Sequence, residues 1–225
     1  MNRECGQCGE TLSIDTFYTD KITTAQLGIL LADGWRHFGT HFFRYNLGIY
    51  EDEIRRVLPL RIRLCDFKFS KSQRRVLRRN SDLNIRIQPI EITEETHDLF
   101  DRHKLRFKRG VPNTIYDFLS PDPANEPTKV LEVSVRRDDG LLAASFFDVG
   151  KTSVSSIYGI FDPTEQARSL GIFTMLKEIE YALETGKEYY YPGYAYEGES
   201  FYDYKKRFSA LEQFDWNGNW ISMQK

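Results

Sequence analysis

Four stretches in the C-terminal part of the chain have the alternation of apolar and polar residues, or the run of β-forming residues, that is typical of β-strands. They are Val130–Arg137, Leu141–Asp148, Val154–Phe161 and Tyr189–Tyr194. Turn sequences at Asp138-Asp139-Gly140 and Val149-Gly150-Lys151 separate the first three stretches. Such short connections predict that these three strands form an antiparallel meander.

Between the third and fourth stretches the period changes to that of a helix. Ile172, Leu176, Ile179 and Leu183 share one helical stripe, and Gly186 follows as a left-handed cap. Strand, helix and strand within about 40 residues predict a βαβ unit with a right-handed crossover. A meander that leads into such a unit resembles the core of the acetyltransferase-like (GNAT) fold. We therefore expect an α+β protein with a GNAT-like mixed sheet.

The N-terminal part is expected to be a smaller α+β region. Leu58–Phe69 is typical of a strand, and Ser70 or Ser72 is positioned to cap a helix that follows it. We expect residues 1–80 to form this region, with a Cys-x-x-Cys motif and a basic segment. Residues 81–225 would form the GNAT-like domain.

The basic segment places Lys71, Arg74, Arg75 and Arg78 on one stripe of the expected helix, with Arg79 beside them. Like charges on one stripe repel by about a few tenths of a kcal/mol per pair. A phosphate backbone would neutralise them, so the stripe favours a nucleic-acid partner. A solvated basic face is the alternative. Residues 1–80 hold 14 Lys and Arg against 9 Asp and Glu, and the rest hold 17 against 24, although the net charge is only −2.

Composition excludes several classes of protein. The 225 residues are 40% hydrophobic and 28% charged, as in globular proteins, and no apolar run approaches the ~20 residues that span a bilayer. Three cysteines do not suit a disulfide framework, so we expect a reducing, cytoplasmic environment and no membrane partner. Cys5 and Cys8 supply only half of a tetrahedral zinc site, so they are weak candidates and we expect no metal. We also expect no cofactor.

Six short motifs resemble those of the aminoacyl-tRNA–protein transferases, which comprise arginyl-tRNA–protein transferase and its bacterial leucyl relative. In this chain they lie in the family's order at Gly34–Gly39, Leu60–Ile62, Ser70–Arg75, Ser155–Pro163, Ser169–Glu180 and Tyr189–Lys205. The last motif combines Tyr-Tyr-Tyr-Pro-Gly-Tyr with Tyr204-Lys205, eleven positions after Gly193. The match extends over most of the chain.

The chain also departs from the family pattern. Residues 45–50 hold no cysteine where the family commonly has a second pair, which argues against the family's metal or iron–sulfur site. Pro192, Tyr202 and Ala210 replace leucine, methionine and proline. The acetyltransferase pyrophosphate loop ends in a small residue where this chain has Phe173, which is expected to fill the space that a pyrophosphate needs.

The resemblance implies transfer of arginine or leucine from aminoacyl-tRNA to the α-amino group of protein N-termini, those with acidic first residues above all, as in N-degron tagging. It implies catalytic roles for Tyr158, Asp162, Tyr191 and Tyr194. It implies substrate binding by Ser169, Leu170, Gly171, Tyr190, Gly193, Tyr204 and Lys205. It implies tRNA binding by Lys71, Arg74, Arg75, Arg78 and Arg79.

Some of these residues could instead have purely structural roles. The side of the strand shared by Tyr189 and Tyr191 could be core, and Asp162 before Pro163 could be only a turn former. Two other functions stay open. One is a coenzyme A-dependent GNAT N-acetyltransferase, and the other is a non-catalytic tRNA-binding module.

Overall fold

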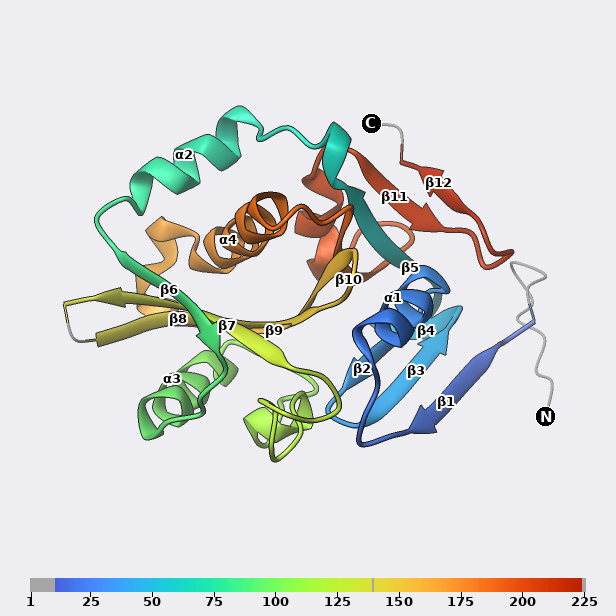
Figure 1. The fold of residues 1–225 in the computed structure, drawn as a ribbon, viewed down its shortest axis with the longest axis horizontal. Helices are drawn as coiled ribbons and strands as arrows, with labels where there is room; N and C mark the ends of the chain where they lie inside the picture. Colours follow the sequence, from blue (N-terminus) through green and yellow to red (C-terminus); the bar gives the residue numbers. More distant parts are fainter. Residues whose placement is uncertain (1–10, 139, 224–225) are drawn as a thin grey trace.

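The computed structural model describes residues 11–138 and 140–223, whose helices and sheets are shown in Figure 1. The α-helices in these ranges are α1 (Thr24–Ala32), α2 (Lys71–Arg79), α3 (Glu94–Lys104) and α4 (Leu170–Glu184). Short 3-10 segments are η1 (Leu64–Asp66), η2 (Ile115–Asp117), η3 (Pro163–Arg168) and η4 (Phe201–Arg207). Cys5 and Cys8 lie outside the described residues.

The large sheet has the strand order β12-β11-β5-β10-β9-β8-β7-β6, and β4 also pairs with β5. Its strands are β4 (Leu47–Tyr50), β5 (Glu53–Arg63), β6 (Asn84–Pro89), β7 (Val130–Arg137), β8 (Gly140–Val149), β9 (Ser153–Phe161), β10 (Tyr189–Tyr196), β11 (Leu211–Phe214) and β12 (Trp220–Ser222). Strands β6 to β9 are antiparallel, and β9 and β10 are parallel around α4. The meander and the βαβ unit are confirmed, and the protein has the expected α+β, GNAT-like fold.

The N-terminal strands form a separate three-stranded sheet of order β1-β3-β2. These strands are β1 (Ile14–Tyr18), β2 (Arg36–Phe38) and β3 (His41–Tyr45). The expected division at residue 80 does not coincide with a division between the sheets, because β5 lies between β10 and β11 in the large sheet. Residues 53–63 are thus an integral part of the GNAT-like sheet.

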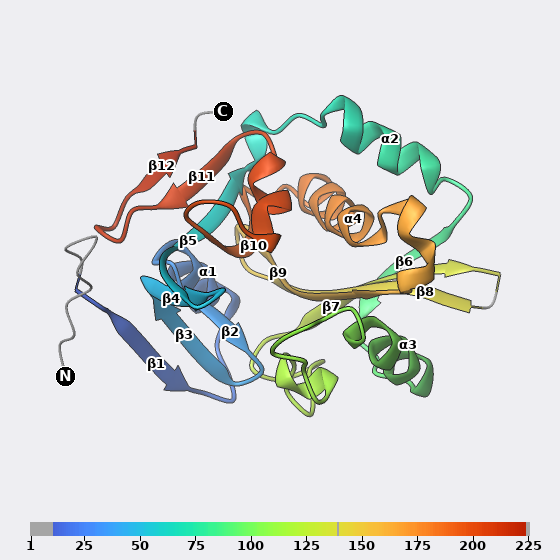
Figure 2. The same cartoon turned by 180° about the vertical axis from the view of Figure 1, so that it is seen from behind.

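Helices cover both faces of the large sheet, as both views show: α4 and α2 lie on one face and α3 on the other (Figures 1 and 2). On the α4 face, Phe173, Leu176 and Ile179 are buried in the larger core. On the α3 face, Leu99 and Phe100 pack in a second core. Burying a side chain of this kind stabilises the fold by about 1.5–3 kcal/mol. No helix in the described part of the chain is long and apolar enough to cross a membrane.

Local sequence explains where the helices begin and end. Ser70 accepts a hydrogen bond from the backbone N–H of Gln73 at 3.2 Å, and the Gln73 side chain accepts one from the Ser70 N–H at 2.8 Å. This capping box fixes the start of α2 at the first of the two serines considered above. Thr23 and Thr93 cap α1 and α3 in the same way. Gly186, with φ +66°, ends α4 as expected.

Strands β9 and β10 pair over three positions and then part. The parallel pairs end at Tyr191 and Ser155, after which β9 continues beside β8 and β10 beside β5. A β-bulge between Tyr190 and Gly193 shifts the register of β10 against β5. Pro192 lies in this bulge, where its missing N–H costs no ladder hydrogen bond. The point of separation is where the candidate site is built.

Candidate active site

Arg36 lies at the point where β9 and β10 separate. It comes from β2, is only 9% exposed, and donates to the Ser155 hydroxyl at 2.6 Å and to the Ser156 carbonyl oxygen. Burial lowers the pKa of Arg36, while the nearby Tyr194 and Asp148 act in the opposite direction. Arg36 is thus a buried cation that extends from the small sheet to β9 of the large sheet.

Lys205 brings a second cation to the same place from η4. Its Nζ donates to the Tyr194 carbonyl oxygen at 2.9 Å. Burial, and to a smaller extent the charge of Arg36, lowers the pKa of Lys205 to about 7. Lys205 as a whole is partly exposed to solvent, so the site around its ammonium group is not closed off from solvent.

Neither cation has an acidic partner in the part of the chain that the structure describes: no carboxylate oxygen lies within 4.0 Å of Arg36 or Lys205. Both groups bond to neutral oxygens instead. A buried charge is costly unless an opposite charge compensates it. The pair is therefore suited to receive an anion.

Glu178 of α4 lies near enough to Arg36 for their charges to interact, and it is fully buried. Tyr190 donates its hydroxyl proton to Glu178 Oε2 at 2.7 Å. Burial raises the pKa of Glu178 to about 7, although the hydrogen bond from Tyr190 opposes the shift. The carboxyl therefore gives Arg36 less compensating charge than a surface glutamate would.

Two further tyrosines complete the cluster. Burial raises the pKa of Tyr204 to about 12, and Arg106 is among the charges that act on it. Burial also raises the pKa of Tyr158, which the charge of Arg106 opposes. The Tyr158 hydroxyl is buried with no hydrogen-bond partner among the described residues, and its ring stacks on Phe118 at 3.7 Å. An unsatisfied buried hydroxyl here offers a hydrogen bond to a bound molecule.

The structure brings together Tyr158, Tyr190, Gly193, Tyr204 and Lys205 of the residues singled out from the sequence. Tyr194 contributes its carbonyl oxygen, whereas its hydroxyl donates to the Gly34 carbonyl oxygen at 2.6 Å. Sequence reasoning did not single out Arg36 or Glu178. Both stand within recognised motifs, and a glutamate on the buried stripe of a helix is itself a signal of a polar site.

Tyr191 and Asp162 lie outside this cluster. Tyr191 packs with Leu27 and Leu31 of α1, as the core interpretation of that strand face expected. Asp162 caps η3 by accepting from the Thr164 N–H at 2.9 Å, and it forms an ion pair with Arg102. These contacts give both residues structural roles.

The start of α4 is closed by packing. Ser169 adopts a left-handed conformation with φ 55°, and Leu170 is buried in the core. A Cβ on Gly171 would lie 3.0 Å from the ring of Phe161, so that ring covers the glycine. Phe173 is 1% exposed and belongs to the core. That it fills the space a pyrophosphate needs stays a prediction.

The five basic residues of α2 are all exposed: Lys71, Arg74, Arg75, Arg78 and Arg79. None has a carboxylate within ion-pair distance in residues 11–138 and 140–223. Arg74 and Arg79 each donate to a backbone carbonyl, of Phe69 and Ala167 respectively. The cations in the last turn of α3 and just after it are different, because Arg102, Lys104 and Arg109 pair with aspartates.

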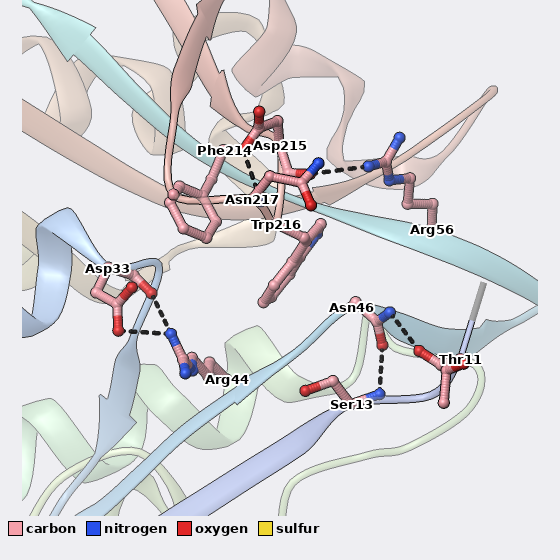
Figure 3. A pocket seen from close by; sticks show the side chains of 11 residues that line it. Thr11, Ser13, Asp33, Arg44, Asn46, Arg56, Phe214, Asp215, Trp216 and Asn217 are labelled. Atoms are coloured by element: carbon pink, nitrogen blue, oxygen red, sulfur yellow. Dashed lines mark hydrogen bonds and ion pairs between the residues drawn. The ribbon is translucent and has the colours of Figure 1, made fainter. Parts of the chain in front are cut away.

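A polar cleft of about 330 Å³ lies elsewhere, between the small sheet and the β11–β12 turn (Figure 3). Its polar side chains largely satisfy one another: Arg44 pairs with Asp33 at 2.5 Å, and Asn46 bonds to Ser13 and Thr11. It shares no lining residue with the Arg36–Lys205 cluster. The described residues contain no group of three or more His, Cys, Asp or Glu side chains that could hold a metal ion.

The sheet defines an acetyltransferase-like fold, and comparison with known sequences gives the family of the chain. Residues 94–215 match the family described as arginine-tRNA-protein transferase, C terminus. The chain therefore belongs to the arginine-tRNA-protein transferase family and is an aminoacyltransferase.

Its relatives include two proteins named aspartate/glutamate leucyltransferase. The one from Helicobacter hepaticus is 28% identical over 201 residues, which cover 87% of this chain and 82% of the relative. The one from Xanthomonas euvesicatoria is 32% identical over 176 residues, 73% of this chain and 70% of the relative. Among solved structures, the C-terminal domain of an Agrobacterium fabrum protein described as a lysylphosphatidylglycerol synthetase has a TM-score of 0.50. It is 18% identical, covers 83% of this chain and 56% of that one, and shows the shared fold alone.

Proposed function

We propose that this protein transfers leucine from leucyl-tRNA to the α-amino group of proteins that begin with aspartate or glutamate. The names of the relatives support this donor and these acceptors. In the reaction the amine nitrogen bonds to the ester carbonyl carbon, and the bond from that carbon to the ribose oxygen breaks. The nitrogen loses a proton, and the ribose oxygen leaves as a hydroxyl.

The observation that carries the proposal is the pair of largely buried cations without acidic partners. Arg36 and Lys205 would bind the side-chain carboxylate of the acceptor's first residue through charge-assisted hydrogen bonds. The acceptor then supplies the negative charge that this site lacks. An acceptor with asparagine in place of aspartate has nearly the same shape but leaves both cations uncompensated.

The same charges favour leucine over arginine as the donated amino acid. An arginyl side chain would approach Arg36, Lys205 and Arg106, and Glu178, a carboxyl near Arg36, has a raised pKa. The neutral leucyl side chain avoids this repulsion. An arginine donor remains the alternative, and it requires that the side chain bind away from these cations.

Positioning supplies much of the catalysis in this proposal. The ester is already activated, and an α-amino group with a pKa of about 7.7–8.0 is partly neutral at pH 7. Holding the amine beside the ester removes much of the entropic barrier. Tyr158 and Tyr204 would line the place where the two meet, and the exposed cations of α2 would hold the phosphates of the tRNA.

The test uses the purified protein with radiolabelled leucyl-tRNA or arginyl-tRNA and peptides that begin with Asp, Asn, Glu or Gln. We expect transfer of leucine to the Asp and Glu peptides and little to their amides. Transfer of arginine and not leucine would contradict the proposed donor. Equal transfer to the acidic peptides and to their Asn and Gln counterparts would contradict the proposed role of the cation pair.

A further inference from the structure

Five aromatic rings form a continuous cluster next to Lys205, and the proposed transfer site uses only one of them, Tyr204. The rings belong to Tyr50 of β4, Tyr196 of β10, and Phe201, Tyr202 and Tyr204 of η4. We propose that the exposed end of this cluster is a stacking platform for the unpaired nucleotides at the 3′ end of the donor tRNA. The inference deepens the proposed function and rests on it.

Contacts between neighbouring rings make the cluster continuous. The rings of Tyr50 and Tyr196 lie 5.1 Å apart, and that of Tyr202 lies 6.0 Å from Tyr196. Phe201 contacts Tyr202 at 5.7 Å and Tyr204 at 6.3 Å. The backbone N–H of Phe201 also donates to the Tyr50 hydroxyl at 2.9 Å, which fixes η4 against β4. The rings are thus held in place before any ligand binds.

The platform is both accessible and cationic. Phe201 is 55% exposed and Tyr202 is 36% exposed, which is high for side chains of this size. Arg106 lies 5.4 Å from the centre of the Phe201 ring, and Arg55 lies 4.9 Å from that of Tyr50. Exposed rings interleaved with cations bind single-stranded nucleic acid, because bases stack on the rings while the cations attract phosphates. An apolar peptide would gain nothing from these charges.

The platform also lies on η4, whose other end is near the start of the basic helix. Ser209, just after η4, bonds through its hydroxyl to both backbone groups of Lys68, just before α2, at 2.9 and 2.8 Å. The start of α2 and the end of η4 are therefore neighbours. At the other end, Lys205 Nζ lies 5.1 Å from the centre of the Tyr202 ring. A tRNA held on α2 could therefore extend its 3′ end along η4 to Lys205 and these rings.

The test uses uncharged tRNA whose terminal adenine is replaced by 2-aminopurine, a fluorescent base that stacking quenches. We expect the wild-type protein to quench it, and Phe201→Leu and Tyr202→Leu to reduce the quenching. In transfer assays both variants should raise the KM for leucyl-tRNA by about tenfold or more. The KM for an Asp peptide should stay the same. Ile29→Ala is the control, since Ile29 is an exposed apolar residue of α1 (70% exposed).

The outcomes separate the platform from the proposed function. If the wild-type protein does not quench, or if both leucine variants match it in quenching and in KM for the tRNA, the platform is wrong. If the wild-type protein quenches, the leucine variants quench less and no amino acid is transferred, the platform stands and the proposed function fails.

Discussion

Lys205 occupies the space that a side chain on Gly193 would enter: a Cβ at position 193 would stand 3.1 Å from Lys205 Nζ. The same Cβ would lie 3.7 Å from the guanidinium of Arg36. Gly193 has a φ of +96°, a conformation that residues with a side chain rarely adopt. The glycine of the bulge therefore leaves room for both cations.

Gly193→Ala should greatly reduce transfer. The added methyl group would displace Lys205 and strain the backbone, and we expect kcat/KM for an Asp peptide to fall by about tenfold or more. Gly186→Ala is the matched control, because Gly186 also has positive φ (+66°) but open space around its Cβ position. If both variants lose the same activity, strain alone explains the effect.

Lys205→Met should stabilise the fold while it impairs function. Replacing an uncompensated buried charge with an apolar side chain of similar length is expected to raise the free energy of unfolding by about 1–4 kcal/mol. The pKa of Lys205 is about 7 in the folded protein and 10.5 in the unfolded chain. Between these two values the unfolded chain therefore keeps the Lys205 proton that the folded protein has lost. The gain should be largest below pH 7 and fade as the pH rises towards 10.5.

Denaturant unfolding at pH 6, 7 and 9 measures this difference. The control is Lys206→Met, since Lys206 pairs with Asp203 at 2.8 Å and should not become more stable when the pair is lost. A fall in stability for Lys205→Met at every pH would show that Lys205 is compensated in the folded protein.

Glu178→Gln should change how stability depends on pH. The pKa of Glu178 is raised to about 7, so the folded state holds a proton that the unfolded state loses near pH 4.5. The wild type should therefore lose stability relative to the variant as the pH rises from about 4.5 to 7, by up to about 3 kcal/mol. Glu180→Gln on the same helix corrects for a lost surface carboxyl. A constant difference across this range would contradict the raised pKa.

Arg75→Glu should weaken tRNA binding without affecting the acceptor. Among the basic residues of α2, Arg74 and Arg79 bond to backbone carbonyls, so Arg75 tests the charge with less risk to the fold. We expect the dissociation constant for tRNA to rise and the slope of log K against log salt to fall by about one. Lys129→Glu, an exposed charge reversal away from α2, is the control. If both variants weaken tRNA binding equally, the net charge of the protein explains the effect and a specific role of α2 is contradicted.

The sequence predicted the local part of the fold well. Alternation and turn residues identified the meander from β7 to β9, and the helical stripe identified α4, because both patterns arise within short stretches of chain. The place of β5 between β10 and β11 could not be predicted in this way, since that pairing joins residues more than a hundred positions apart. The expected boundary at residue 80 missed this pairing for the same reason.

The candidate site could be predicted only where a motif marked it. Gly193, Tyr204 and Lys205 stood out from the sequence and meet in the structure. Arg36 did not, because it reaches the site from the other sheet and nothing in its neighbours shows that its side chain lies between β9 and β10. Tyr191 shows the opposite limit: a strand sends successive side chains to opposite faces, and adjacent tyrosines looked alike in the sequence.

The most direct measurement is the ratio of kcat/KM for an Asp peptide to that for the matching Asn peptide, in the wild type and in Lys205→Met. We expect a ratio of at least about 30 in the wild type, because a charge that faces two buried cations contributes about 2 kcal/mol or more. In Lys205→Met the ratio should fall towards one, because kcat/KM falls for the Asp peptide and stays the same for the Asn peptide. A ratio that is the same in both proteins would show that Lys205 does not recognise the acceptor's carboxylate.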